Sequence, residues 1–360
     1  MKICFIQHRA YELFNPNIKT QFGGAEVQMY LHAKELAKNK NIDVHFIVAN
    51  YNQLVIEKID NVTIHKSSSF NDPVLQQAIS FFKIFKKIDA DTYVQMTLTR
   101  FSFLIAFLCR LNGKKFIYLI SHDNDIDGKI LKTNYFIQKL SLLVFIFSNK
   151  IIAQNSYQYN SLKKYCISSE IIKSSLETTI TNTSGKEYHL WMARAELWKR
   201  PELYLQLAKL NPHEKFKMVC PPFAEFDAAY YNKLIEESKM LNNLEFINHY
   251  IDFDELDNLF SNAKLFINTS EFEGFPTTFI HACKNGIPIL SLSVNPDSLF
   301  EEHHIGFYCH HNMEEMQLKF QELNKNKELY DACKINCKEY FNATHNISNN
   351  SNKLLQLIIR

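Results

Sequence analysis

The stretch Ser270–Leu290, SEFEGFPTTFIHACKNGIPIL, is the most informative part of this sequence for the fold. It begins with acids and a glycine, and Pro276 then precedes a run that predicts a helix starting near Thr277 and Thr278. The apolar segment Ile287–Leu292 follows and predicts a buried strand. A helix followed directly by a buried strand is one repeat of an α/β sheet.

The start of this helix is also a candidate binding site. Its free backbone N–H groups and the positive end of its dipole attract phosphate. Glu273 lies just upstream, where a carboxylate can bind sugar hydroxyls through charge-assisted hydrogen bonds. The segment from Glu273 through Phe275 to Thr278 therefore predicts a site for a sugar joined to a phosphate.

Short apolar runs alternate with longer amphipathic runs along the rest of the chain. The strand candidates are Ile3–Gln7, Val44–Val48, Thr92–Gln95, Lys115–Ile120 and Lys150–Ala153, then Tyr188–Ala193, Phe216–Cys220, Leu244–Ile247, Leu265–Asn268 and Ile287–Leu292. Such alternation predicts parallel sheets covered on both faces, and the polar segment Glu177–Glu187 predicts a linker. We expect an α/β protein of two doubly wound, Rossmann-like domains facing a central cleft, at residues 1–178 and 188–344. A terminal helix at about 345–360 would pack back on the first domain.

Composition narrows the class of protein. The chain has 360 residues, 46% of them hydrophobic and 22% charged, which is typical of a globular protein with two domains. A net charge of +2 gives no reason to expect a nucleic-acid partner. The eight cysteines form no C-x-x-C pair, the first residues lack a secretory signal, and the apolar runs fall short of the ~20 residues that span a bilayer. We expect a cytoplasmic protein with reduced thiols.

Two further segments follow predicted strands. Gly23 and Gly24, in FGGAE, open a helix, and glycines let the backbone approach a ligand closely. An ordinary loop that needs glycine for its turn is the alternative. Arg194 and Lys199, in ARAELWKRP, lie five residues apart, where a guanidinium and an ammonium can both hold a diphosphate. A solvated basic turn is the alternative there.

His122 follows the predicted strand Lys115–Ile120, where a side chain at a cleft is expected. A structural histidine is the alternative. The string from Asp123 to Gly128 matches the first half of a calcium loop, but Asn134 stands where the loop needs a bidentate glutamate. We therefore expect no metal site.

Taken together, these segments resemble the signatures of family 4 glycosyltransferases, and Glu273 fits the first acid of the E-x7-E frame in that family. The matching motifs are EGFP at 273–276, GGAE at 23–26, S-H-D at 121–123, IIAQNS at 151–156 and WKRP at 198–201, so the resemblance covers most of the chain. It implies the GT-B architecture and retaining transfer of a sugar from a nucleotide-sugar, UDP- or GDP-linked, to a hydroxyl of a glycan or lipid-linked acceptor in surface polysaccharide biosynthesis.

The resemblance also implies roles for the domains and for single residues. The first domain would take the acceptor and the second the nucleotide-sugar. Arg194 and Lys199 would hold the phosphates, His122 would contact the donor sugar, and Glu273 completes the catalytic candidates. The donor-binding candidates are Gly23, Gly24, Phe275, Pro276, Thr277, Thr278, His281, Tyr250 and Ile251. No metal or other cofactor is expected, since positive side chains and helix amides neutralise the diphosphate. Peripheral contact with the inner face of the plasma membrane is a further hypothesis, because the first half is basic and apolar.

Three positions depart from the family pattern. His281 stands where the second acid of the frame usually holds the ribose, and an imidazole cannot bind two hydroxyls as a carboxylate does. Ala193 replaces a glycine, and Cys220-Pro221-Pro222 replaces a glycine-rich turn. Two alternatives to an active transferase therefore remain, a non-catalytic subunit or binding module and a nucleotide-sugar epimerase on the same fold.

Overall fold

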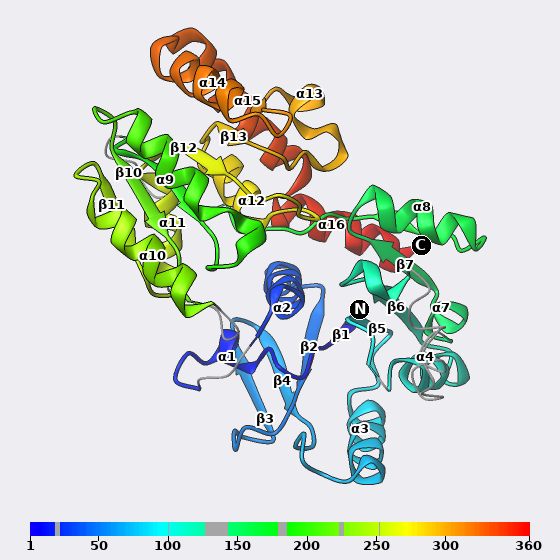
Figure 1. Ribbon diagram of the computed structural model, residues 1–360. Helices are drawn as coiled ribbons and strands as arrows, with labels where there is room; N and C mark the ends of the chain where they lie inside the picture. Colours follow the sequence, from blue (N-terminus) through cyan, green and yellow to red (C-terminus); the bar gives the residue numbers. More distant parts are fainter. Residues whose placement is uncertain (19–21, 100, 127–142, 179–185, 223–226, 252) are drawn as a thin grey trace. The chain divides into compact units, whose positions relative to one another are not determined.

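The computed structural model describes residues 1–18, 22–99, 101–126, 143–178, 186–222, 227–251 and 253–360. The chain forms two compact units (Figure 1). The first unit contains Met1–Glu177 and His345–Arg360, and the second contains Thr178–Thr344. The chain thus leaves the first unit, builds the second, and returns to the first with its last helix.

The first unit is built on an eight-stranded sheet in the order β3-β4-β2-β1-β5-β6-β7-β8. Every neighbouring pair is parallel except β3 and β4, which form an antiparallel hairpin. The strands are β1 Lys2–Ile6, β2 Asp43–Val48, β3 Ile56–Ile59, β4 Val62–Lys66, β5 Thr92–Met96, β6 Lys115–Leu119, β7 Lys150–Ala153 and β8 Glu170–Ile171.

Helices cover both faces of this sheet. The helices are α1 Tyr11–Phe14, α2 Gly24–Leu36, α3 Val74–Ile88, α4 Ser102–Leu111, α7 Val144–Phe147, α8 Ser156–Lys164 and α16 Ile347–Ile359, with a 3-10 turn η1 at Asp123–Asp125. Alternate side chains of β1 point to opposite faces. Ile3 and Phe5 pack in one core with α1, α2 and α16, whereas Cys4 and Ile6 pack in another with α3, α4 and α7. Each face is therefore closed by its own set of helices.

The second unit is built on a six-stranded, wholly parallel sheet in the order β11-β10-β9-β12-β13-β14. Its strands are β9 Tyr188–Met192, β10 Phe216–Val219, β11 Leu244–Ile247, β12 Ala263–Asn268, β13 Ile289–Ser291 and β14 Gly306–Tyr308. Its helices are α9 Pro201–Leu210, α10 Ala228–Lys239, α11 Phe253–Ser261, α12 Thr277–Lys284, α13 Leu299–His303, α14 Met313–Lys325 and α15 Lys327–Thr344, with 3-10 turns η2 at Leu197–Lys199 and η3 at Pro296–Ser298. Numbered within the unit, this is the doubly wound order 3-2-1-4-5-6.

The predicted α/β class with Rossmann-like parallel sheets is confirmed. Each strand candidate coincides with an observed strand, with ends that differ by at most two residues, and the structure adds β3, β4, β8 and β14. Part of the predicted linker, residues 179–185, lies outside the described residues. Over the ranges that are described, no helix combines the length and the apolar character needed to cross a bilayer.

Candidate functional site

The strand order places a candidate site at the carboxyl ends of β9 and β12. β10 and β12 lie on opposite sides of β9, so the chain leaves β9 in one direction and β12 in the other. Ligands of doubly wound sheets bind at such a switch point. Arg194 and Lys199 follow β9, and Glu273 follows β12. Three of the four predicted catalytic residues therefore lie at this edge.

Lys199 and Glu273 form an ion pair, with 2.9 Å between Lys199 Nζ and Glu273 Oε2. Their side chains are only 11% and 15% exposed, so water screens the pair less than a surface pair. Glu273 Oε1 also accepts hydrogen bonds from Ser270 Oγ at 2.6 Å and Asn268 Nδ2 at 3.1 Å. The structure thus holds the carboxylate in one orientation beside the ammonium.

Asn268, Thr269 and Ser270 form a polar triplet at the end of β12, and this triplet connects the loop after β12 to the loop after β9. Thr269 Oγ1 donates to the backbone carbonyl of Lys199 at 2.8 Å and accepts from Trp191 Nε1, also at 2.8 Å. Asn268 is 5% exposed, and its Oδ1 has no hydrogen-bond partner within the described residues. A buried acceptor without a donor is costly, so this oxygen is suited to a ligand hydroxyl. Sequence reasoning missed these residues, although a polar triplet directly after a buried strand was a usable signal.

An aromatic side chain supports Lys199 from a second direction. Lys199 Nζ lies 3.8 Å from the centroid of the Trp198 ring, and the Phe272 ring stacks on Trp198 at 4.9 Å with 13° between planes. The backbone N–H of Glu271 donates to the Trp198 carbonyl at 2.8 Å, which ties the two loops together. Arg194 forms its own ion pair with Glu196, at 3.2 Å, and is 45% exposed.

The helix α12 begins as the sequence predicts. Pro276 is its N-cap residue with a φ of −65°, and no side chain caps the helix start. Thr277 is exposed, and Phe275 and Thr278 are half-buried. The amides of the first turn are therefore oriented for an anion just beyond Glu273.

His281 lies one turn further along α12, in a different environment. It is 5% exposed, its ring stacks on Phe260 of α11 at 5.3 Å, and Nδ1 has no partner within the described residues. Burial, with the nearby Lys284 charge, lowers the pKa of His281 to about 4, so the ring is neutral at pH 7. Whether it contacts a nucleotide stays a prediction.

Tyr250 and Ile251 follow β11 at the same sheet edge. Tyr250 is 62% exposed, its hydroxyl donates to the Pro222 carbonyl at 3.1 Å, and Ile251 is half-buried. In the proline turn after β10, the Pro221 carbonyl accepts a hydrogen bond from the Ala195 amide at 3.0 Å. The turn that departs from the family pattern is therefore anchored to the loops around it.

The other candidates lie in the first unit. Gly23 is the N-cap residue of α2, and its amide donates to Glu26 Oε2 at 2.9 Å. Glu26 Oε1 accepts from Gln7 Nε2 at 2.7 Å, so the acid of the GGAE segment ties the helix start to the end of β1. An added Cβ would lie 3.3 Å from Glu26 Oε2 at Gly23, but would meet nothing within 4 Å at Gly24.

His122 is exposed after β6, and its carbonyl accepts from the Asp125 amide at 3.0 Å. The acids that follow it stabilise this turn. Asp123 Oδ1 accepts from Gln158 Nε2 at 2.9 Å, and burial raises the pKa of Asp125. The rest of the calcium-like string, including Gly128 and Asn134, lies outside the described residues.

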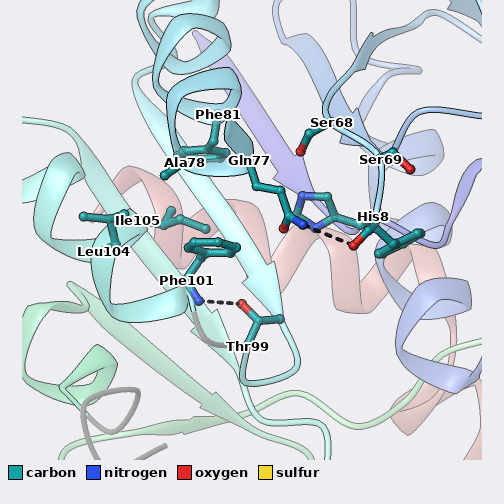
Figure 2. Close-up of a pocket in the computed structure, with 11 residues that line it drawn as sticks. His8, Ser68, Ser69, Gln77, Ala78, Phe81, Thr99, Phe101, Leu104 and Ile105 are labelled. Atoms are coloured by element: carbon teal, nitrogen blue, oxygen red, sulfur yellow. Dashed lines mark hydrogen bonds between the residues drawn. The ribbon is translucent and has the colours of Figure 1, made fainter. Parts of the chain in front are cut away.

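A pocket of about 180 Å³ lies within the first unit (Figure 2). Its wall is largely apolar, with a few polar groups from the loops that follow β1, β4 and β5. The lining residues are His8, Ser68, Ser69, Phe70, Gln77, Ala78, Phe81, Thr99, Phe101, Leu104 and Ile105. Gln77 Nε2 donates to the Phe70 carbonyl at 3.2 Å, and burial lowers the pKa of His8 to about 4. Sequence reasoning did not foresee this pocket, because its residues come from five separate segments.

Known proteins resemble this chain in the sequence of its second unit and in its fold. Residues 177–340 match the family model described as glycosyl transferases group 1. A comparison with curated proteins gives no match. Among solved structures, the chain resembles sucrose-phosphate synthase from Thermosynechococcus elongatus with a TM-score of 0.72 at 13% identity, covering 99% of this chain and 98% of that one.

Two further structures have the same fold. HepE of Anabaena in complex with UDP gives a TM-score of 0.70 at 14% identity, covering 99% of both chains. A glycosyltransferase from Rickettsia africae gives 0.69 at 14% identity, covering 99% of this chain and 97% of that one. Residues 177–340 therefore match the glycosyl transferases group 1 family model, and the chain as a whole shares the two-sheet GT-B fold of these solved structures.

Proposed function

We propose that the protein is a retaining glycosyltransferase that moves a sugar from a nucleotide-sugar to an acceptor hydroxyl in surface polysaccharide synthesis. The observation that carries the proposal is the Lys199–Glu273 ion pair at the β9/β12 edge, just before the uncapped start of α12. A UDP-sugar is the favoured donor, because HepE is described in complex with UDP and with UDP-glucose.

The residues divide the work according to their chemistry. Lys199 and the first amides of α12 neutralise the diphosphate, so that it leaves with the electron pair of the broken glycosidic bond. Glu273 and Asn268 Oδ1 accept hydrogen bonds from sugar hydroxyls. The anomeric carbon forms its new bond to the acceptor oxygen, and the hydroxyl proton ends on the released diphosphate or in water. Charge on the diphosphate is balanced by protein groups, so we expect no metal requirement.

The first test is turnover with a panel of UDP-, GDP- and ADP-sugars, for the wild type and for Lys199→Ala. We expect Lys199→Ala to lower kcat/KM by about 10²–10³-fold, as removal of a single charge-stabilising donor does in other enzymes. Lys217→Ala is a matched control, since Lys217 forms a 3.0 Å pair with Glu245 away from the site. The control should retain activity within about twofold. An equal loss in both variants would contradict the assignment.

A non-catalytic binding module is the second candidate, and the position of His281 favours it. Its ring packs on Phe260, where the family pattern has an acid for the ribose. A thermal-shift assay with UDP separates the two functions, because a ligand that binds only the folded state raises the Tm by mass action. A UDP-dependent shift without turnover on any donor would support the binding module.

A further inference from the structure

The helix α3 presents an apolar stripe to solvent. Its inner face contributes Phe81, Phe85 and Ile88 to the core of the first unit. Its outer face contributes Leu75, Ile79 and Phe82, with exposures of 73%, 47% and 44%. These residues are four and then three positions apart, so they share one side of the helix. Most exposed apolar residues are scattered singly, whereas this stripe extends over two turns.

The same helix carries an excess of positive charge. The sequence of α3, VLQQAISFFKIFKKI, contains no acid, and Lys83, Lys86 and Lys87 are exposed on its last two turns. Lys86 Nζ lies 5.8 Å from the centroid of the Phe82 ring and donates to Asn112 Oδ1 at 2.9 Å. Over the described ranges, no carboxylate forms an ion pair with these lysines. An exposed apolar stripe beside ammonium groups that form no ion pair in those ranges is the pattern of a helix that lies in a membrane interface.

The apolar pocket of the first unit lies against the same helix. Phe81, Ala78 and Gln77 line it from α3, and Phe70, just before the helix, lines it while remaining 49% exposed (Figure 2). The pocket and the exposed stripe therefore belong to the same helix, α3. A bilayer in contact with α3 would bring lipid close to a pocket with an apolar wall.

We propose that α3 docks the protein on an anionic lipid bilayer. The stripe Leu75, Ile79 and Phe82 enters the boundary between headgroups and acyl chains, and Lys83, Lys86 and Lys87 contact lipid phosphates. Charge complementarity selects this occupant, because α3 carries three lysines and no acid, so the same helix of a second copy offers these lysines no opposite charge. The proposal stands independently of glycosyl transfer.

Vesicle flotation with the full chain tests the docking. The wild type should bind vesicles of phosphatidylcholine with 30 mol% phosphatidylglycerol, and should bind pure phosphatidylcholine vesicles at least about tenfold more weakly. Replacing Lys83, Lys86 and Lys87 by Gln should reduce binding to anionic vesicles by about tenfold or more. Replacing Leu75, Ile79 and Phe82 by Ser should also reduce binding to anionic vesicles by about tenfold or more, and binding should stay weak at low salt. The circular dichroism spectrum and the Tm of this variant should be close to those of the wild type.

The matched control removes the same charge from the second unit. Lys209, Lys233 and Lys239 are exposed there, and their triple Gln variant should bind anionic vesicles like the wild type. Loss of binding in this control would show that net charge alone is responsible and would overturn the proposal. Failure of the wild type to bind anionic vesicles would do so as well. Sedimentation showing a dimer that the Ser variant abolishes would assign the stripe to a second copy instead.

Discussion

Lys199 is held from two sides in the second unit. Glu273 Oε2 lies 2.9 Å from its ammonium, and the Trp198 ring centroid lies 3.8 Å away. A cation over an aromatic face gains about 0.5–2 kcal/mol, more when it is desolvated. Trp198 therefore positions the ammonium of Lys199, and under the proposed function it would act on the diphosphate only through Lys199.

Substitution of Trp198 tests this role. Trp198→Leu should lower kcat/KM by about 3–30-fold, which corresponds to the loss of a cation–π contact, whereas Trp198→Phe keeps an aromatic face and should retain most of the activity. Steady-state kinetics with the preferred donor measure both, and Tm values exclude a general loss of structure. Equal activity of the Leu and Phe variants would contradict the role.

At the scale of single residues, the sequence predicted the charged residues Lys199 and Glu273 but not the polar residues that hold them in place. Lys199 and Glu273 were predicted from motifs, and the structure brings them together. Asn268 and Thr269 were missed because their roles depend on which strand lies beside which, and β9 pairs with β12 although some 70 residues separate them. His281 was predicted as a donor-binding residue from its position in the E-x7-E frame, but a position in the sequence does not determine where the ring points.

Elements with long apolar runs were predicted well, whereas short or half-exposed ones were missed. The hairpin β3–β4 turns at Asp60 and Asn61, with φ values of 50° and 63°. A two-residue turn with both φ values positive is the type I′ geometry, which Asp and Asn tolerate. The segment IDNVT therefore carried a hairpin signal. β3 buries little apolar surface, so the apolar periodicity that would predict it as a strand was weak.

The edge strand β14 depends on a single glycine. Gly306 pairs with Ile289 of β13 and has a φ of 148°. A Cβ at this position would lie 1.8 Å from the Ile289 carbonyl oxygen, so backbone must move to accept any side chain. The pairing of these two strands therefore requires glycine here.

Gly306→Ala should destabilise the second unit by about 3 kcal/mol or more, since both backbone strain and a backbone clash result. Urea unfolding followed by circular dichroism measures the loss. Gly274→Ala is the control for stability, because an added Cβ there meets nothing within 4 Å, and it should change the free energy of unfolding by less than about 1 kcal/mol. A Gly306→Ala protein as stable as this control would refute the strain.

For the whole molecule, four histidines with a lowered pKa contribute to the response to acid. Burial is the main cause that lowers the pKa to about 4 for His8, His32 and His65 in the first unit and for His281 in the second. Their unfolded pKa is about 6.5, so between pH 6.5 and 4 the unfolded chain takes up protons that the folded chain does not. The contribution of these histidines to stability is therefore full above pH 6.5 and falls as the pH decreases toward 4.

His32 is the clearest case, because it is 2% exposed and its Nδ1 lies 2.8 Å from Ser351 Oγ on α16. At pH 5 its protonation alone should cost about 2 kcal/mol of folding free energy. His32→Gln should reduce the difference between urea midpoints at pH 7 and pH 5. His213→Gln, an exposed control, should leave that difference unchanged. The same pH difference in the wild type and His32→Gln would rule out this cause.

The return of the chain to the first unit at His345 also sets an order on biosynthesis. The ribosome makes residues 1–177 first. However, Leu354, Leu357 and Ile358 of α16 belong to the same core as the apolar residues of α2. At about 5–20 residues per second, roughly 10 to 40 seconds pass before these side chains are made. The second unit is continuous in sequence, and its last helix, α15, ends at Thr344, before α16 begins. During translation the first unit is thus the last to be completed, with an apolar face open to chaperones until α16 has emerged.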